Sequence, residues 1–482
     1  MTLHLLSPLD GRYQKDTEPL RDYFSEFAYL RARARLELDF LSALSRIGIC
    51  PPVNISLDVF TDEDALKIQE YEKTTRHDVK AIEYFLRDKI LVCHSEEPQG
   101  DEESSTSEQK TLRQKKAQTD IISFIHFGLT SEDINNIAQA LALRDSRDKV
   151  LLPALDDLLA TLRDFAKKYR ALPMLARTHG QPAVPTTLGK EIAVYLARLK
   201  KCRDEIADHK FEAKLTGAVG NFNALQAAAP HVDWISFSKE FIESFDLQPN
   251  LVTTQILPYD NWIRYFDSIK LANLILSDYT QDVWRYVSDG FLRQKVVENE
   301  VGSSTMPQKV NPIDFENAEG NLGLANSLLT HYGQKLAVSR LQRDLSDSTV
   351  RRTFGVALAH TLLAWINITR GMGRVDADEE NIKHELNKHW EVVSEGAQTI
   401  LRAAGRSGAY ESLKSQTRGR ILTEADFKAW VEALEVDEET RTKLKSLSPE
   451  SYIGLAVQIA DDVIASVFRE AISNSDEEVA SS

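Results

Sequence analysis

Long segments of the chain lack proline and carry apolar residues at helical spacing. Residues 186–229, 259–306 and 313–448 contain no proline, the residue that most often interrupts a helix. In the first segment, apolar residues recur at three-, four- and seven-residue steps, at Leu188, Ile192, Leu196, Leu199 and Ile206. Charged residues such as Lys190 and Arg198 lie off this stripe. The spacing predicts an amphipathic helix over 188–206.

Two later segments repeat the pattern. One stripe comprises Ile263, Phe266, Ile269, Leu274 and Val283, and the other comprises Val356, Leu358, Leu362, Leu363 and Ile366. Alternating β-branched runs with tight turns are scarce. We therefore predict an all-α fold with long central helices. A helix longer than about 25 residues needs a bundle partner to bury its stripe, so a homo-oligomeric bundle is expected.

The overall charge limits the class of partner. The chain has 482 residues, a formal net charge of -15 and a pI near 5.3. Because nucleic-acid phosphates need clustered Lys and Arg, we expect no nucleic-acid partner. A small anionic substrate stays compatible, provided that its site is locally basic.

The distribution of apolar residues and cysteines bears on location. No apolar run of about 20 residues marks a membrane span, and no signal peptide is recognised at the start. The three cysteines, Cys50, Cys93 and Cys202, are widely spaced and form no CxxC or Cys/His metal pattern. A reduced cytoplasmic protein without a membrane partner is expected.

Residues 94–116 differ from the rest of the chain. They read HSEEPQGDEESSTSEQKTLRQKK and are nearly free of apolar side chains. Such a segment cannot offset its ordering entropy by burial, so we expect a surface loop. A partner-binding role is the alternative.

The segment Gly302–Pro312, GSSTMPQKVNP, contains the candidate chemistry. Its glycine and two prolines oppose a regular helix, and glycine lets a ligand approach the backbone closely. Lys309 and Asn311 can direct two donors at an anion. On composition alone, an ordinary helix connection is the alternative.

This segment resembles the GSSxMPxKxNP signature of the fumarase/aspartase/argininosuccinate lyase superfamily. The resemblance implies a loop that closes over the substrate. It implies that Ser303 is the general base, that Ser304 contacts the substrate, and that Lys309 and Asn311 hold its carboxylate. A carbanion next to a carboxylate spreads its charge into that group, so fixed donors lower the barrier. Ser303 needs activation, which Lys309 and loop amides can supply.

His179 is the candidate acid. It lies in ARTHGQPA, and a histidine is suited to donate a proton near neutral pH. A lone histidine in a turn flanked by Gly and Pro is more often structural. The block RTHGQPAVPTTLGKE, however, resembles the second conserved block of the superfamily, which implies that His179 protonates the leaving nitrogen.

Three further blocks resemble the adenylosuccinate lyase branch. SPLDGRY implies that Arg12 and Tyr13 contact the nucleotide. TRHDVKAIEY implies that Arg76 and His77 lie near the phosphate, where arginine suits two oxygens at once, and that Asp78 binds the substrate. HFGLTSEDINN implies that the Thr130 and Ser131 hydroxyls bind substrate oxygens. The alternatives are solvated helix residues in the second block and a helix capping box at TSED in the third.

The resemblance also covers later residues. It implies substrate-binding roles for Gln255, Asn317, Arg343, Ser348 and Arg352, the last three in a phosphate-binding stretch. A basic solvated helix face is the alternative for that stretch. Gln308 departs from the histidine that many adenylosuccinate lyases have there, and argininosuccinate lyases share this glutamine.

The family implies three helical domains, at 1–128, 129–372 and 373–482. The central domain would form a long-helix bundle joining a homotetramer, with each site built from three chains. The implied reaction releases fumarate from a succinyl-amino nucleotide, without metal or redox cofactor. The rivals are another lyase of the superfamily, such as argininosuccinate lyase, and a non-catalytic helical scaffold.

Overall fold

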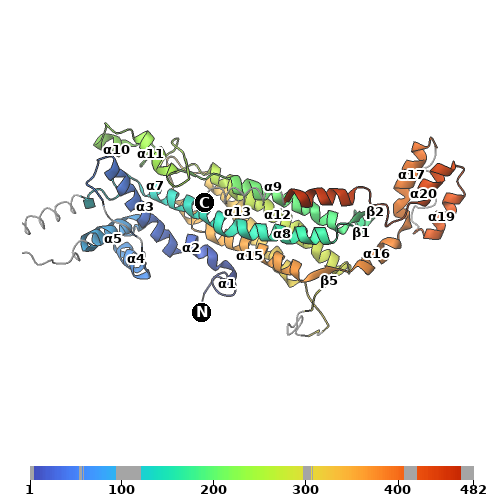
Figure 1. Ribbon diagram of the computed structural model, residues 1–482. Helices are drawn as coiled ribbons and strands as arrows, with labels where there is room; N and C mark the ends of the chain where they lie inside the picture. Colours follow the sequence, from blue (N-terminus) through green and yellow to red (C-terminus); the bar gives the residue numbers. More distant parts are fainter. Residues whose placement is uncertain are drawn as a thin grey trace, which may run out of the picture. The chain divides into compact units, whose positions relative to one another are not determined.

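The computed structural model describes residues 5–53, 57, 59–93, 121–296, 305–306, 308–406 and 421–467 (Figure 1). The chain divides into two compact units. Unit 1 comprises Met1–Pro153, Glu205–Lys270 and Leu324–Leu362, and unit 2 comprises Ala154–Asp204, Leu271–Gly323 and Leu363–Ser482. The polar segment 94–116 lies outside the described residues, as do Ser303 and Ser304. The boundaries of the three expected domains stay a prediction.

Helices make up most of both units. Those of unit 1 are α1 Gln14–Thr17, α2 Arg21–Phe24, α3 Glu26–Arg46, α4 Asp62–Thr75, α5 Asp78–Cys93, α7 Ser131–Ser146, α10 Asn223–Ala228, α11 Trp234–Glu243 and α14 Ser346–Arg351, with the short turns η1 Glu18–Leu20 and η2 Arg147–Leu151. Those of unit 2 are α16 Glu379–Asn387, η3 Trp390–Val393, α17 Ser394–Ala403, α19 Glu424–Glu432 and α20 Glu438–Lys445. Five long helices contain a unit boundary, namely α8 Leu152–Lys168, α9 Leu188–Asp208, α12 Asp260–Ser288, α13 Ile313–Leu336 and α15 Phe354–Gly373. The all-α prediction is confirmed.

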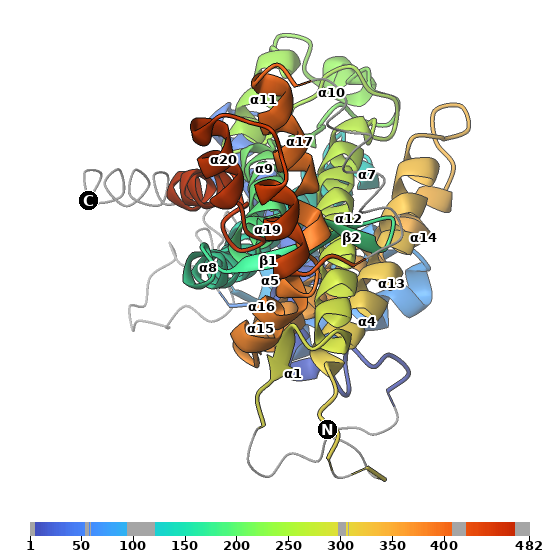
Figure 2. The ribbon, with the colours of Figure 1, turned by 90° about the vertical axis from the view of Figure 1, so that its right-hand side faces the viewer.

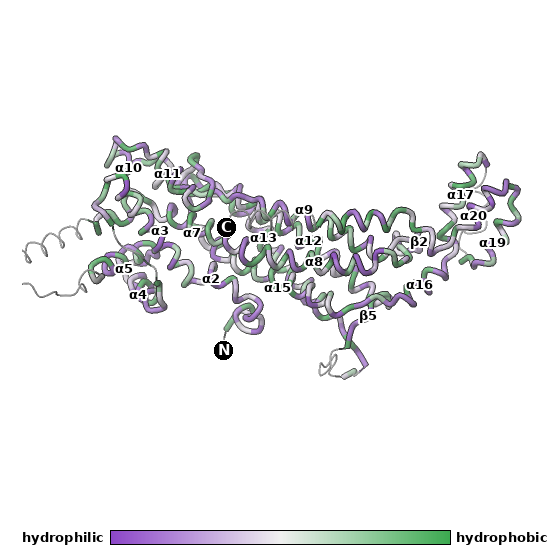
Figure 3. The backbone as a smooth tube through the Cα atoms, viewed as in Figure 1, coloured by the Kyte–Doolittle hydropathy of each residue, from purple (hydrophilic) through white to green (hydrophobic). Residues whose placement is uncertain are grey.

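The predicted stripes coincide with long helices. The helix expected over 188–206 is α9, and its five stripe residues are all buried. The other two stripes lie on α12 and α15. Figure 3 shows hydrophobic and hydrophilic positions alternating along these helices. Not every apolar position is covered within the single chain, since Leu274 of α12 is 52 % exposed.

Side-chain caps fix the start of several helices. The backbone N–H of Thr130 donates to the Asp133 carboxylate at 2.9 Å, which is one arm of a capping box at the start of α7. The helix start predicted at TSED is therefore confirmed. Ser25 caps α3 by accepting from the backbone N–H of Ala28 at 3.1 Å.

Among the described residues, strands occur as three short pairs. β1 Pro173–Thr178 and β2 Gln181–Thr187 form an antiparallel hairpin in unit 2, visible in Figure 2, and β5 Leu292–Gln294 pairs antiparallel with β6 Val375–Ala377. β3 Glu212–Ala213 pairs parallel with β4 Gln248–Pro249 in unit 1. The β1–β2 hairpin was not predicted as strands, because its three prolines remove ladder donors and its apolar residues do not alternate.

His209 is packed in an aromatic cluster of unit 1. Its ring centroid lies 4.7 Å from that of Phe211 and 5.5 Å from that of Tyr265, and its Nε2 lies 3.1 Å from Asn261 Oδ1. Burial lowers the pKa of His209 to about 4, and the positive charge of Arg147 acts in the same direction.

This depressed pKa predicts a pH dependence of stability. Between about pH 6.5 and pH 4 the unfolded chain binds a proton that native His209 does not, so the free energy of unfolding falls as the pH falls. The slope from this group is at most about 1.4 kcal/mol per pH unit, and less because the ring is partly exposed. We expect His209→Gln to flatten the decline in urea unfolding experiments. Parallel profiles for both proteins would contradict this assignment.

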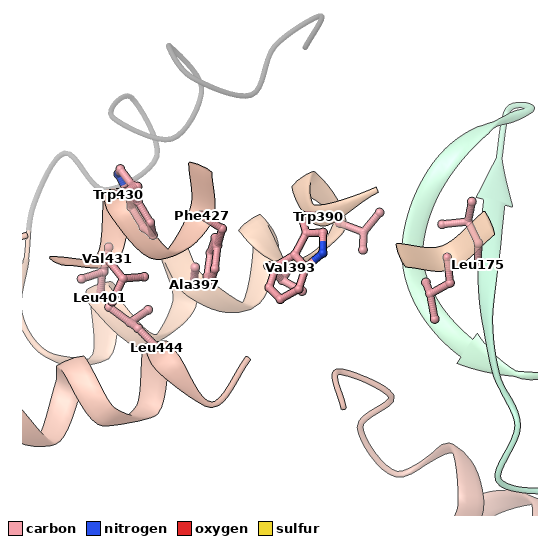
Figure 4. Packing of buried hydrophobic residues seen from close by; sticks show 11 residues of the cluster. Leu175, Trp390, Val393, Ala397, Leu401, Phe427, Trp430, Val431 and Leu444 are labelled. Atoms are coloured by element: carbon pink, nitrogen blue, oxygen red, sulfur yellow. The ribbon is translucent and has the colours of Figure 1, made fainter. Parts of the chain in front are cut away.

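Helices α17, α19 and α20 of unit 2 pack around a hydrophobic core. Leu401 of α17, Phe427 and Val431 of α19, and Leu444 of α20 are buried and point toward one another (Figure 4). We expect Leu444→Ala to lower the free energy of unfolding by about 2–5 kcal/mol, because it leaves a cavity. The exposed Leu455→Ala is the control, with an expected change within about 0.5 kcal/mol. Equal losses in urea unfolding would show that burial does not decide the cost.

None of the described helices combines the length and apolar character needed to cross a membrane.

Candidate active site

Two of the sequence blocks meet at the start of α5 and of α7 in unit 1. The Nε2 of His77 lies 3.4 Å from the hydroxyl of Ser131. The Nδ1 of His77 accepts a hydrogen bond of 3.2 Å from the backbone N–H of Lys80. A neutral imidazole that accepts at Nδ1 carries its proton on Nε2, so His77 presents a donor beside the Ser131 hydroxyl. Both side chains are accessible to a ligand, since His77 is exposed and Ser131 is partly exposed.

Arg76 and Thr130 flank this pair. Arg76 ends α4 in the left-handed conformation, with φ of 50°, and its side chain is exposed. Thr130 is the N-cap of α7, so its backbone lies where orphan helix N–H groups attract anions. The structure thus places a histidine donor beside the Ser131 hydroxyl, with Arg76 and Thr130 as their neighbours along the chain.

Asp78 joins the same region through arginines. Its Oδ2 lies 3.0 Å from Nη1 of the buried Arg33 and 3.3 Å from Nη2 of Arg352, which directly follows α14. Burial raises the pKa of the Asp78 carboxyl, but Arg33, the backbone N–H of Val79 and Arg352 outweigh it and hold the pKa below its usual range. An ionised carboxylate repels a phosphate, so this geometry suits Asp78 to hold Arg352. Its predicted substrate contact stays a prediction.

Gln255 and Arg343 form a second group of candidate binding residues in unit 1. The Nη1 of Arg343 donates to Gln255 Oε1 at 3.3 Å, and Nε2 of Gln255 donates to the Ala218 carbonyl at 3.1 Å. The backbone carbonyl of Gln255 accepts from Nζ of Lys214 at 2.8 Å. Lys214 is fully buried in an ion pair with Asp133, so the backbone at Gln255 is firmly held.

A buried polar network adjoins these residues and is not among the features predicted from the sequence. Glu132 lies between Ser131 and Asp133, and its carboxylate contacts Arg351 and Tyr259. Burial raises the pKa of the Tyr259 phenol well above its ordinary value, which keeps it a neutral donor. The signal in the sequence was the acidic Glu132 within TSED, a segment predicted to be a helix capping box or to supply hydroxyls that bind the substrate.

Two further unit 1 candidates lie on or next to short helices. Arg12 is exposed just before α1, with its guanidinium carbon 5.9 Å from the centroid of the Tyr13 ring. Ser348 is partly exposed on α14. Their roles stay predictions.

In unit 2, His179 lies at the tip of the β1–β2 hairpin. Thr178 pairs with Gln181, so His179 and Gly180 form a two-residue loop with φ of 54° and 73°. Two successive positive φ values define a type I′ turn, which matches the twist of the strands. Histidine is one of the few non-glycine residues enriched at positive φ. The His179 side chain at this turn is exposed.

The described part of the signature loop adjoins α13 in unit 2. The backbone N–H of Lys309 donates to the Met306 carbonyl at 3.1 Å, which closes a turn, and the Lys309 side chain is exposed. Asn311 is partly exposed. Pro312 accepts the first hydrogen bonds of α13. Asn317 accepts at Oδ1 from Asn367 at 2.6 Å.

Comparison with known proteins defines the class. Residues 18–325 match the family model described as Lyase, and residues 339–453 match the model described as Adenylosuccinate lyase C-terminal. Solved structures share the fold: a fumarate lyase from Mesorhizobium sp. BNC1 has a TM-score of 0.69 at 16 % identity, covering 93 % of this chain and 97 % of that one. The 3-carboxy-cis,cis-muconate lactonizing enzyme of Pseudomonas putida has a TM-score of 0.66 at 20 % identity, with coverage of 94 % and 97 %.

Relatives in sequence narrow the class further. The adenylosuccinate lyase of Haemophilus influenzae is 42 % identical over 471 residues, which cover 95 % of this chain and 98 % of that protein. The adenylosuccinate lyase of Escherichia coli K12 is 41 % identical over 476 residues, with coverage of 96 % and 99 %. That of Dictyostelium discoideum is 42 % identical over 475 residues, with coverage of 94 % and 97 %. The chain belongs to the adenylosuccinate lyase family.

Proposed function

We propose that this chain eliminates fumarate from adenylosuccinate to give AMP, and from the succinylcarboxamide imidazole ribotide in the analogous step of purine synthesis. The observation that carries this proposal is the identity of 42 % to an adenylosuccinate lyase over 95 % of the chain. The convergence of an arginine, a histidine donor and hydroxyls in unit 1 supports a phosphate-bearing substrate. A non-catalytic scaffold has no need of this arrangement.

Two residues carry the proton transfers. Ser303 removes a proton from the succinyl Cβ, and His179 donates a proton to the departing nitrogen as the carbon–nitrogen bond breaks. The elimination is anti, so the two groups act from opposite faces of the substrate. Lys309 and Asn311 hold the carboxylate that takes up the charge of the carbanion, and a fixed positive charge there lowers the barrier.

The unit 1 residues bind the nucleotide end. The phosphate is bound by Arg76, His77, Ser131, Arg343 and Arg352. Gln255, which accepts from Arg343, orients the neighbouring part of the substrate. A guanidinium binds two phosphate oxygens at once, which a lysine cannot do. Binding energy from this unreactive end places the succinyl group for reaction.

The chain acts as a homotetramer in the cytoplasm. Apolar side chains on two long helices are exposed in the single chain, among them Val194 of α9 and Leu271 and Leu274 of α12. A second bundle surface would bury them. We expect light scattering to give four times the chain mass of 54.4 kDa. A monomer that is fully active at assay concentration would contradict shared active sites.

A substrate panel tests the proposed function. Purified full-length protein is incubated with adenylosuccinate, the imidazole ribotide or argininosuccinate, and fumarate is followed by absorbance. We expect fumarate from the two nucleotides and none from argininosuccinate, with rates unchanged by a metal chelator. Turnover of argininosuccinate alone would assign the chain to a different lyase reaction.

A further inference from the structure

A fully buried carboxylate follows directly after Ser131 in the first turn of α7. The Glu132 side chain is 0 % exposed. Its Oε2 accepts from Nη2 of Arg351 at 2.8 Å, and its Oε1 accepts from the Tyr259 hydroxyl at 2.8 Å. A buried carboxylate is tolerated only when its oxygens are paired in this way. These bonds fix Glu132 in one orientation.

Glu132 also faces an arginine that a ligand can reach. Its Oε2 lies 3.6 Å from Nη1 of Arg343, the same nitrogen that donates to Gln255 Oε1. The Arg343 side chain is 17 % exposed, whereas that of Arg351 is 2 % exposed. Arg343 therefore lies at the border between the buried network and the region of the proposed site.

The network holds equal numbers of acidic and guanidinium side chains. Glu132 and Asp347 supply two negative charges, and Arg343 and Arg351 supply two positive ones. Asp347 is committed to Arg351, at 3.0 Å. Tyr259 has one proton to donate, and its distance of 2.8 Å to Glu132 is shorter than the 3.2 Å to Asp347. Among the described residues, Glu132 is the carboxylate that pairs with Arg343.

We propose that Glu132 is a positioning residue that orients Arg343 toward the substrate phosphate and thereby sets the affinity for the phosphorylated nucleotide. Glu132 is buried and does not touch the substrate. It acts through Arg343, while Arg351 and Tyr259 hold it in place. This inference rests on the proposed function, which gives Arg343 a place in the phosphate-binding stretch.

The test compares ligands with and without the phosphate. Glu132→Gln keeps the side-chain size and an acceptor for Tyr259 but removes the charge. We expect the KM for adenylosuccinate and the inhibition constant for AMP to rise about tenfold, as for loss of a charged hydrogen-bonded partner. The inhibition constant for adenosine should change less than about twofold and kcat less than about threefold, because Glu132 acts on phosphate binding.

Two further variants complete the design. Tyr259→Phe removes one anchor of Glu132 without removing a charge. It should weaken the binding of AMP, by less than Glu132→Gln does, and leave the binding of adenosine unchanged. This variant carries the test if Glu132→Gln does not fold. Asp282→Asn is the matched control, since Asp282 also accepts from a tyrosine, Tyr195 at 2.5 Å, and belongs to no proposed binding group. It should leave both constants unchanged.

The possible outcomes distinguish failure of the role of Glu132 from failure of the proposed function. Equal weakening of AMP and adenosine, or no weakening of AMP, in the folded variants would overturn the role of Glu132. Failure of the wild-type protein to release fumarate would instead overturn the proposed function. Calorimetric titration with AMP and adenosine measures both affinities without turnover, so it tests Glu132 in either case.

Discussion

Replacing Ser303 by alanine is expected to lower kcat for fumarate release by about 10²–10⁴-fold, the usual contribution of a positioned acid or base. The variant lacks the oxygen that we propose takes the Cβ proton, while the proposed substrate contacts of Lys309, Asn311 and the unit 1 residues are retained. KM should therefore change little, because the lost interaction exists only in the transition state. Steady-state kinetics with adenylosuccinate measure both constants.

A control and a contrary outcome accompany this prediction. Ser446→Ala removes an exposed hydroxyl at the end of α20 and should leave kcat and KM unchanged. Undiminished turnover by Ser303→Ala would show that another group is the base. The proposed catalytic role of the signature segment Gly302–Pro312 would then be wrong as well, since that role depends on this serine.

Replacing His179 by asparagine is expected to lower kcat by about 10²–10⁴-fold as well, through loss of the proposed acid. Asparagine is chosen because residue 179 has a φ of 54°, and asparagine tolerates this left-handed conformation. The β1–β2 hairpin should therefore keep its register while the imidazole is lost. His179→Ala also strains the backbone at this position. Any loss of activity beyond that of His179→Asn would therefore measure the effect of distorting the turn.

The two variants give a check on each other. If His179→Asn keeps a normal kcat while Ser303→Ala does not, the departing nitrogen receives its proton from a different group. Unchanged thermal stability of His179→Asn would show that the loss of activity is chemical, since the hairpin is then intact.

The helices could be predicted from the sequence because their signals are local. The stripe from Leu188 to Ile206 and the cap at Thr130 depend only on neighbours along one helix. The β1–β2 hairpin was missed because its turn uses His179 and Gly180 at positive φ, and its prolines hide the strand pattern. Leu274 was expected to be buried in a bundle, and among the described residues of the single chain it stays 52 % exposed.

The sequence predicted which segments contribute to the site, but not which of their residues meet in space. No spacing rule brings His77 to Ser131 or Arg352 to Asp78, because those pairs are separated by 54 and 274 residues along the chain. The resemblance supplied their association, and the structure brings these pairs together within unit 1. The Glu132 network was beyond the sequence, since a glutamate beside a helix cap is usually solvated, and its burial depends on Arg351 and Tyr259.

The central claim is that Ser303 and His179 act on one substrate from opposite faces. A crystal structure of full-length Ser303→Ala with bound adenylosuccinate tests it most directly. The account predicts that the His179 imidazole lies about 3 Å from the bridging nitrogen, that residue 303 faces the succinyl Cβ, and that the phosphate lies against Arg76, His77 and Arg352. A bound substrate flanked by neither residue 179 nor residue 303 would contradict the account.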